Sequence, residues 1–172
     1  MQKIIQCDTR QKMNKKHHKL KEQYFSDKGY TILRSKLAIG DYAIPSDMSR
    51  VVDTKQNCSE LYTDLIQDHD RFHNEVVLAQ ECGIQLYILV ENKEGFMKPE
   101  DILKWKNPQM FRYYKAKKLA EKNGTKPPKP PASNLQLIKI MHSMNRDYGV
   151  EFLFCRTHDA GEMIVKLLAG EK

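Results

Sequence analysis

Apolar residues recur along the chain in two alternating patterns, short continuous runs and stretches with helical spacing. The short runs predict strands over residues 3–7, 30–33, 42–44, 51–55, 84–90 and 150–155. The helical spacing predicts helices over residues 12–28, 59–81, 133–148 and 157–168. Strands and helices in this order predict an α/β fold with a mixed central β-sheet flanked by helices.

Local residue choices indicate how these elements begin and connect. Ser59 is expected to cap one long helix that runs to about Glu81. Residues 84–90 form a continuous apolar run directly after that helix, which predicts a strand buried on both faces. Residues 45–47 (Pro-Ser-Asp) predict a hairpin-like turn, so the three strands between residues 30 and 55 are expected to form a meander.

Residues 92–132 break the pattern and indicate a basic insertion within a single domain spanning residues 1–172. This segment contains eleven Lys and Arg residues but only four acidic ones, and the excess equals the net charge of +7 of the whole chain. It also carries Trp105 and a group of further aromatic residues, and it ends in the proline-rich run at 126–131, which favours an extended linker.

The insertion has two interpretations. Its cations could contact phosphates while its aromatic rings stack on unpaired bases. Alternatively, it is a solvated basic helix whose aromatic residues pack on the core, and Trp105 is the ring most expected to pack. The candidate nucleic-acid contacts are Lys104, Lys106, Arg112, Lys115, Lys117 and Lys118.

Composition adds a partner and a setting to this picture. The 172 residues are 40% hydrophobic and 30% charged, as expected for one globular domain, and the pI near 9.1 makes an anionic partner plausible. The apolar run near the N-terminus is too short for a signal peptide, and no strand is long enough to cross a bilayer, so no membrane association is expected. Cys7, Cys82 and Cys155 are expected to be buried thiols, which fits the reduced cytoplasm of a bacterial, phage or archaeal cell.

Candidate chemistry is concentrated between residues 37 and 55. Asp41 follows a glycine, and Asp53-Thr54-Lys55 ends an apolar run. Side chains two residues apart on a strand share a face, so Asp53 and Lys55 should project together, with Asp41 on a neighbouring strand near enough to share an ion. Carboxylates that hold a divalent metal ion, with a lysine beside them, are suited to phosphodiester hydrolysis. An ordinary turn followed by a solvated strand edge is the competing interpretation.

The order of these motifs resembles the XPF-type (XPF/Hef-like) nuclease domain, a branch of the PD-(D/E)XK superfamily. The family's Asp-x-Arg-Glu, Gly-Asp-Tyr and Glu-Arg-Lys motifs have counterparts here at residues 8–11, 40–42 and 53–55. A helix bearing Arg71 and Glu75, then a buried strand followed by Glu91, also match the family order. The resemblance covers nearly the whole chain except residues 92–132.

The resemblance implies a restriction-endonuclease-like core and a metal-dependent DNA endonuclease that acts on branched or otherwise structured DNA. Asp41, Asp53 and Lys55 would be catalytic, and Asp8, Asp41 and Asp53 would hold Mg²⁺, for which Mn²⁺ should substitute. The helices over residues 133–148 and 157–168 would form a homodimer, with core packing as the rival explanation of their apolar faces.

Departures from the family motifs support a rival function. The family's glutamate and arginine are replaced by Gln11 and Thr54, and Glu60 is displaced by one position. These changes favour a DNA-binding or partner-binding module that keeps the fold without catalysis. The persistence of both aspartates and the lysine favours the nuclease.

Six further side chains have interpretations of their own. Asp8 is either a metal ligand or a turn residue that binds its own backbone. Arg10 either contacts a phosphate or pairs with Asp8. Arg71 is expected to support the site or face a phosphate, and Glu75 to form only a surface pair with it. His69 and His73 have zinc-ligand spacing, but no third ligand is evident in the sequence, and a polar helix face explains them as well.

Overall fold

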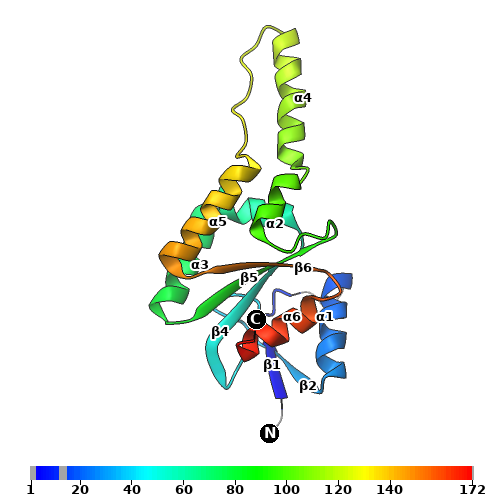
Figure 1. The fold of residues 1–172 in the computed structure, drawn as a ribbon, viewed down its shortest axis with the longest axis vertical. Helices are drawn as coiled ribbons and strands as arrows, with labels where there is room; N and C mark the ends of the chain where they lie inside the picture. The colour runs from blue at the N-terminus through cyan, green and yellow to red at the C-terminus, as the bar shows by residue number, and fades with distance from the viewer. Residues whose placement is uncertain (1–2, 12–14, 172) are drawn as a thin grey trace.

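The computed structural model of the protein describes residues 3–11 and 15–171, and it is organised around one mixed six-stranded sheet (Figure 1). The strand order is β2-β1-β3-β4-β5-β6. The strands are β1 (Lys3–Cys7), β2 (Tyr30–Arg34), β3 (Tyr42–Ile44), β4 (Asp47–Lys55), β5 (Gln85–Asn92) and β6 (Glu151–Arg156). The predicted α/β class and the position of each predicted strand are confirmed.

The pairing of β2 corrects the predicted meander. β2 pairs with β1 in parallel. β1 lies between β2 and β3, and it pairs with β3 in the antiparallel direction. The connection between β1 and β2 contains the helix α1 (Lys16–Asp27), which provides the length that a parallel crossover needs. Only β3 and β4 form the predicted hairpin, with its turn at residues 45–46.

Helices cover both faces of the sheet and create two cores (Figure 1). One face carries α3 (His69–Glu81) and α5 (Asn134–Tyr148), and the other carries α1 and α6 (Ala160–Ala169). Successive residues of β5 enter opposite cores: Ile88 lies in the first and Leu89 in the second. The prediction that this strand is buried on both faces is therefore confirmed.

The predicted single helix over residues 59–81 is wrong, because the chain forms three consecutive helical segments there. These are α2 (Cys58–Tyr62), the π-helical turn η1 (Thr63–Gln67) and α3. The Asn57 side chain, not Ser59, caps α2 by accepting a hydrogen bond from the Glu60 backbone N–H at 3.0 Å. In η1, the Asp68 N–H donates to the Thr63 carbonyl at 2.8 Å, five residues back, and this wider turn changes which side chains face the sheet.

The insertion forms an arm that leaves the body of the protein (Figure 1). It begins with the 3₁₀ helix η2 (Pro99–Lys104), and Trp105 then packs into the core beside Tyr62, with ring centroids 6.3 Å apart. The predicted packing of Trp105 is thus confirmed. The helix α4 (Pro108–Lys122) projects outward, and residues 123–133 return without regular secondary structure.

The cysteine expectation needs one correction. Cys82 is exposed because it lies at the C-terminal end of α3, where Gly83 turns the chain toward β5, whereas Cys7 and Cys155 are buried as expected. Among the residues that the structure describes, no helix has the length and apolar character needed to span a membrane.

Candidate active site

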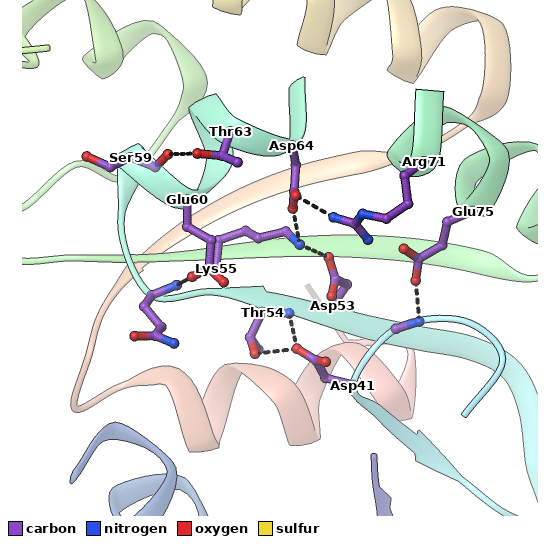
Figure 2. Close-up of polar contacts among 12 residues, drawn as sticks. Asp41, Asp53, Thr54, Lys55, Ser59, Glu60, Thr63, Asp64, Arg71 and Glu75 are labelled. Atoms are coloured by element: carbon purple, nitrogen blue, oxygen red, sulfur yellow. Dashed lines mark hydrogen bonds and ion pairs between the residues drawn. The ribbon is translucent and has the colours of Figure 1, made fainter. Parts of the chain in front are cut away.

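Backbone hydrogen bonds bring the predicted carboxylates Asp41 and Asp53 together beside β4 (Figure 2). The Asp41 N–H donates to the Val52 carbonyl at 2.9 Å, which holds the residue before β3 against β4. The β3–β4 ladder pairs Tyr42 with Val52, so Asp41 and Asp53 each lie one residue from that pair. The predicted proximity of the two aspartates therefore follows from strand pairing.

Thr54 orients the Asp41 side chain. One carboxylate oxygen of Asp41, Oδ2, accepts hydrogen bonds from the Thr54 N–H at 2.9 Å and from the Thr54 hydroxyl at 2.7 Å (Figure 2). Burial raises the pKa of Asp41, while the two bonds from Thr54 act in the opposite direction. The residue that replaces the arginine of the resembled motif thus has a defined role in placing a carboxylate.

Asp53 and Lys55 share one face of β4, as the two-residue spacing predicts, and they form a buried ion pair. Lys55 Nζ lies 2.6 Å from Asp53 Oδ2 and 2.5 Å from Asp64 Oδ2 (Figure 2). Despite these short contacts, neither oxygen has a hydrogen-bond partner of ordinary geometry among the described residues. Both oxygens are buried, and the Lys55 ammonium group is the cation that faces them.

The electrostatic balance differs between the two partners of this pair. Burial raises the pKa of Asp53 to about 7, and repulsion by Asp41 adds to the rise, while Lys55 opposes it. Burial by itself would lower the pKa of Lys55, but attraction by Asp53 and Asp64 outweighs this and raises it. The site therefore keeps a charged lysine beside Asp53, whose burial opposes its ionisation.

Asp64 is a site residue that the sequence analysis missed. Its carboxylate is buried, and its second oxygen, Oδ1, accepts a hydrogen bond at 2.6 Å from Arg71, whose side chain is 58% exposed. Asp64 lies in η1, so its direction depends on a π-turn that helical periodicity does not reveal. An acidic residue beside the apolar positions Leu61 and Leu65 was the one signal available in the sequence.

Glu75 does not form the predicted surface pair with Arg71. Its Oε1 atom accepts a hydrogen bond from the Gly40 N–H at 2.7 Å (Figure 2). Burial and the nearby charge of Asp53 raise the pKa of Glu75. Glu75 therefore holds α3 against the turn that precedes Asp41, while Arg71 contacts Asp64 instead, and its expected supporting or phosphate-facing role stays a prediction.

Asp8 and Arg10 form a tight turn beside the carboxylates. Asp8 Oδ1 accepts hydrogen bonds from the Arg10 N–H and from Arg10 Nε, each at 2.7 Å, and Oδ2 accepts one from the Leu37 N–H at 2.7 Å. The Asp8 N–H in turn donates to the Asp41 carbonyl at 2.8 Å. These bonds match the turn-residue interpretation of Asp8 and the pairing interpretation of Arg10. A metal-binding role for Asp8 stays a prediction.

The remaining predicted residues lie outside this cluster. The six candidate cations between Lys104 and Lys118 belong to η2, to α4 or to the link between them, and α4 projects away from β4 (Figure 1). Lys104 and Lys117 have acidic neighbours, Asp101 at 3.5 Å and Glu121 at 4.0 Å. The rings of His69 and His73 stack 5.8 Å apart, and His73 Nε2 lies 2.8 Å from the Tyr148 hydroxyl.

The donor set at β4 suits a hard divalent cation. Within residues 3–11 and 15–171, no group of three or more His, Cys, Asp or Glu side chains is placed to bind one metal ion. Mg²⁺ does not require such a group, since it is commonly held by one or two carboxylates and keeps several water ligands. Asp41 and Asp53 are two buried carboxylates, and the charge of Asp41 raises the pKa of Asp53, so a cation between them would relieve that repulsion.

The fold and this cluster define an XPF-like nuclease domain. The sequence model of the family described as the ERCC4 domain matches residues 7–167, so the chain belongs to that family. Comparison with the curated proteins found no match.

Two similar solved structures are XPF from Aeropyrum pernix in complex with DNA and XPF from Aeropyrum pernix. Each has a TM-score of 0.59 and 17% sequence identity to this chain. The first comparison covers 97% of this chain and 64% of the other, and the second covers 96% and 63%. The likeness confirms the predicted fold, and the chain spans a little under two thirds of the archaeal chains that it matches.

Proposed function

We propose that this protein is a metal-dependent DNA endonuclease that acts on branched or otherwise structured DNA. The observation that carries the proposal is the convergence of Asp41, Asp53 and Lys55 beside β4 in a member of the ERCC4 domain family. DNA as the substrate is supported by the net charge of +7 and by the DNA complex of the similar archaeal XPF.

The side chains divide the chemistry between them. Asp41 and Asp53 would hold Mg²⁺, or Mn²⁺ in its place, which when bound neutralises charge on the attacked phosphoryl group and acidifies a water molecule. Lys55, fixed between Asp53 and Asp64, supplies a positive charge and hydrogen-bond donors that orient this water or stabilise the developing charge. Arg71, which is exposed beside them, would contact a neighbouring phosphate.

Cleavage assays with matched variants test this function. Labelled branched and linear DNA is incubated with Mg²⁺ or Mn²⁺ and with the wild type, Asp53→Asn, Lys55→Ala or the control Asp147→Asn, which changes an exposed aspartate on α5. We expect the wild type and the control to cut, and both site variants to lose about 100-fold or more in rate. A wild type that binds DNA without cutting it would favour the non-catalytic module, and equal cutting by all variants would refute the assigned site.

A homodimer through α5 and α6 is a separate proposal. The two helices lie on opposite faces of the sheet, and their main apolar residues, such as Met141 and Ile164, are buried in different cores. Core packing thus accounts for these faces, and a dimer would have to use outward residues such as the half-exposed Leu135. Sedimentation velocity at micromolar concentration decides the question, because a species at the chain mass of 20.1 kDa counts against the dimer.

A further inference from the structure

The outward side of α4 is a surface of uniform charge that also exposes aromatic rings. Positions three, four, seven and eleven residues apart on a helix share one side, and here they hold Phe111, Tyr114, Lys115, Lys118 and Lys122, with Arg112 beside them. We call these six residues the arm face. Phe111 is 76% exposed and Tyr114 is 59% exposed, so neither ring contributes to a core.

The inward side of α4 has a different composition and a structural role. Ala120 is buried there, and its carbonyl accepts a hydrogen bond at 2.9 Å from the Thr125 N–H at the start of the returning segment. Lys117 is half-buried and lies beside Glu121, the one acidic residue of the helix. Among the described ion pairs, none uses a cation of the arm face. The helix thus keeps its compensated charge on one side and four uncompensated cations on the other.

Folding explains neither the aromatic rings nor the cations of the arm face. The exposure of aromatic rings to water, on a helix that projects from the body, is unfavourable. Such exposed apolar groups are typical of a binding surface. Four cations without acidic partners repel one another, and an anionic partner would offset this repulsion. The partner should therefore combine regularly spaced negative charge with flat apolar surfaces.

An unpaired nucleic-acid strand meets both requirements. Its phosphates match the cations, and its bases expose faces on which aromatic rings stack. A DNA duplex offers the same phosphates but keeps its bases stacked on each other, so it would leave Phe111 and Tyr114 without a partner. An acidic protein segment would satisfy the cations but not the rings.

We propose that the arm face binds an unpaired DNA strand that continues from the duplex engaged at the candidate active site. The inference rests on the proposed function in one respect, that the substrate is DNA. The α4 helix spans about 22 Å at 1.5 Å per residue, long enough to follow several nucleotides. The arm would thereby favour substrates that contain a single-stranded branch over continuous duplex.

Binding measurements without divalent metal test the arm face separately from cleavage. Fluorescence anisotropy in EDTA compares a labelled single strand with a blunt duplex of equal length, using the full chain. The first variant, Phe111→Ala/Tyr114→Ala, has Leu78→Ala as its control, which removes a partly exposed apolar side chain from α3. The second, Lys115→Gln/Lys118→Gln/Lys122→Gln, has as its control the same charge change at exposed Lys139, Arg146 and Lys166.

The two variants should lose DNA affinity in different ways. The aromatic variant should lose about tenfold or more in affinity for the single strand and change little for the duplex. The charge variant should weaken binding to both and reduce the salt dependence for the single strand, by about 0.7 in logarithmic slope for each cation. Circular dichroism checks that α4 stays helical.

Three outcomes would overturn the proposal: an aromatic variant that binds the single strand as the wild type does, equal losses on single strand and duplex, or displacement of the strand by polyglutamate at equal charge. Because no cleavage is needed, these outcomes are independent of the proposed nuclease activity. Conversely, variants that lose single-strand binding yet still cut duplex DNA would leave the assigned active site intact.

Discussion

Asp64 Oδ2 lies 2.5 Å from Lys55 Nζ, on the opposite side of the ammonium group from Asp53 (Figure 2). The candidate catalytic lysine is therefore held by carboxylates from two elements, the strand β4 and the π-turn η1. Asp64 also binds Arg71, so one buried aspartate links the lysine to an arginine at the protein surface.

Replacing Asp64 should affect turnover more than DNA binding. In Asp64→Asn, Lys55 loses one of its two charged contacts, and Asp53 alone then determines the position of its ammonium group. We therefore expect kcat to fall by about tenfold or more while KM changes less. Asp64→Glu, which keeps the charge, should recover part of the loss. Steady-state cleavage kinetics measure both, with the exposed Asp68→Asn as the control. An unchanged kcat in Asp64→Asn would remove Asp64 from the site.

The ionisation of Asp53 predicts a dependence of stability on pH. Burial, reinforced by Asp41 and opposed by Lys55, raises the pKa of Asp53 from its ordinary value of 3.8 to about 7. Between these values the folded state keeps a proton that the unfolded state has lost, so the free energy of unfolding contributed by this group falls as the pH rises.

Urea unfolding in EDTA between pH 5 and 8 measures this effect. Relative to the wild type, Asp53→Asn should become more stable as the pH rises, because it lacks the carboxylate that must ionise while buried. Mn²⁺ added at pH 8 should stabilise the wild type and not the variant, since the metal binds the folded carboxylates. Parallel pH profiles for the two proteins would contradict the assignment.

Gly40 should be the least replaceable glycine of the site. Its φ is +64°, and a Cβ added there would lie 2.4 Å from Val51 Cγ1. Gly29 is the matched control, because its φ is +76° but nothing lies within 4 Å of an added Cβ. We expect Gly29→Ala to cost about 1 kcal/mol and Gly40→Ala a further 1–3 kcal/mol, roughly, together with lost cleavage because Asp41 is displaced. Urea unfolding that gives equal costs would show that the Val51 contact is easily relieved.

Lys21 and Glu91 form an ion pair in which both side chains are fully buried. Removing one partner leaves an uncompensated polar group in the core, so Lys21→Met should cost about 3–5 kcal/mol. The double variant Lys21→Met/Glu91→Leu should regain most of that loss, because apolar packing replaces the pair. A double-mutant cycle by urea unfolding measures the coupling, and additive costs would contradict a direct interaction.

Strand identity and the facing of side chains were readable from the sequence because both depend on local periodicity. The spacing of Asp53 and Lys55 placed them on one face, and the apolar run ending at Val90 indicated a doubly buried strand. The family motifs also indicated Asp41. Its position near Asp53 requires only that the adjacent strand, β3, pair with β4.

The tertiary structure decided how distant segments combine. The insertion of β1 between β2 and β3 and the bond from Gly40 to Glu75, 35 residues away, depend on the packing of whole elements. The direction of Asp64 depends on a π-turn, since an identical sequence in a regular helix would point it elsewhere. Local periodicity therefore determined the strands and the shared face of Asp53 and Lys55, while Lys55 acquired its second carboxylate, Asp64, only when the sheet and the helices packed together.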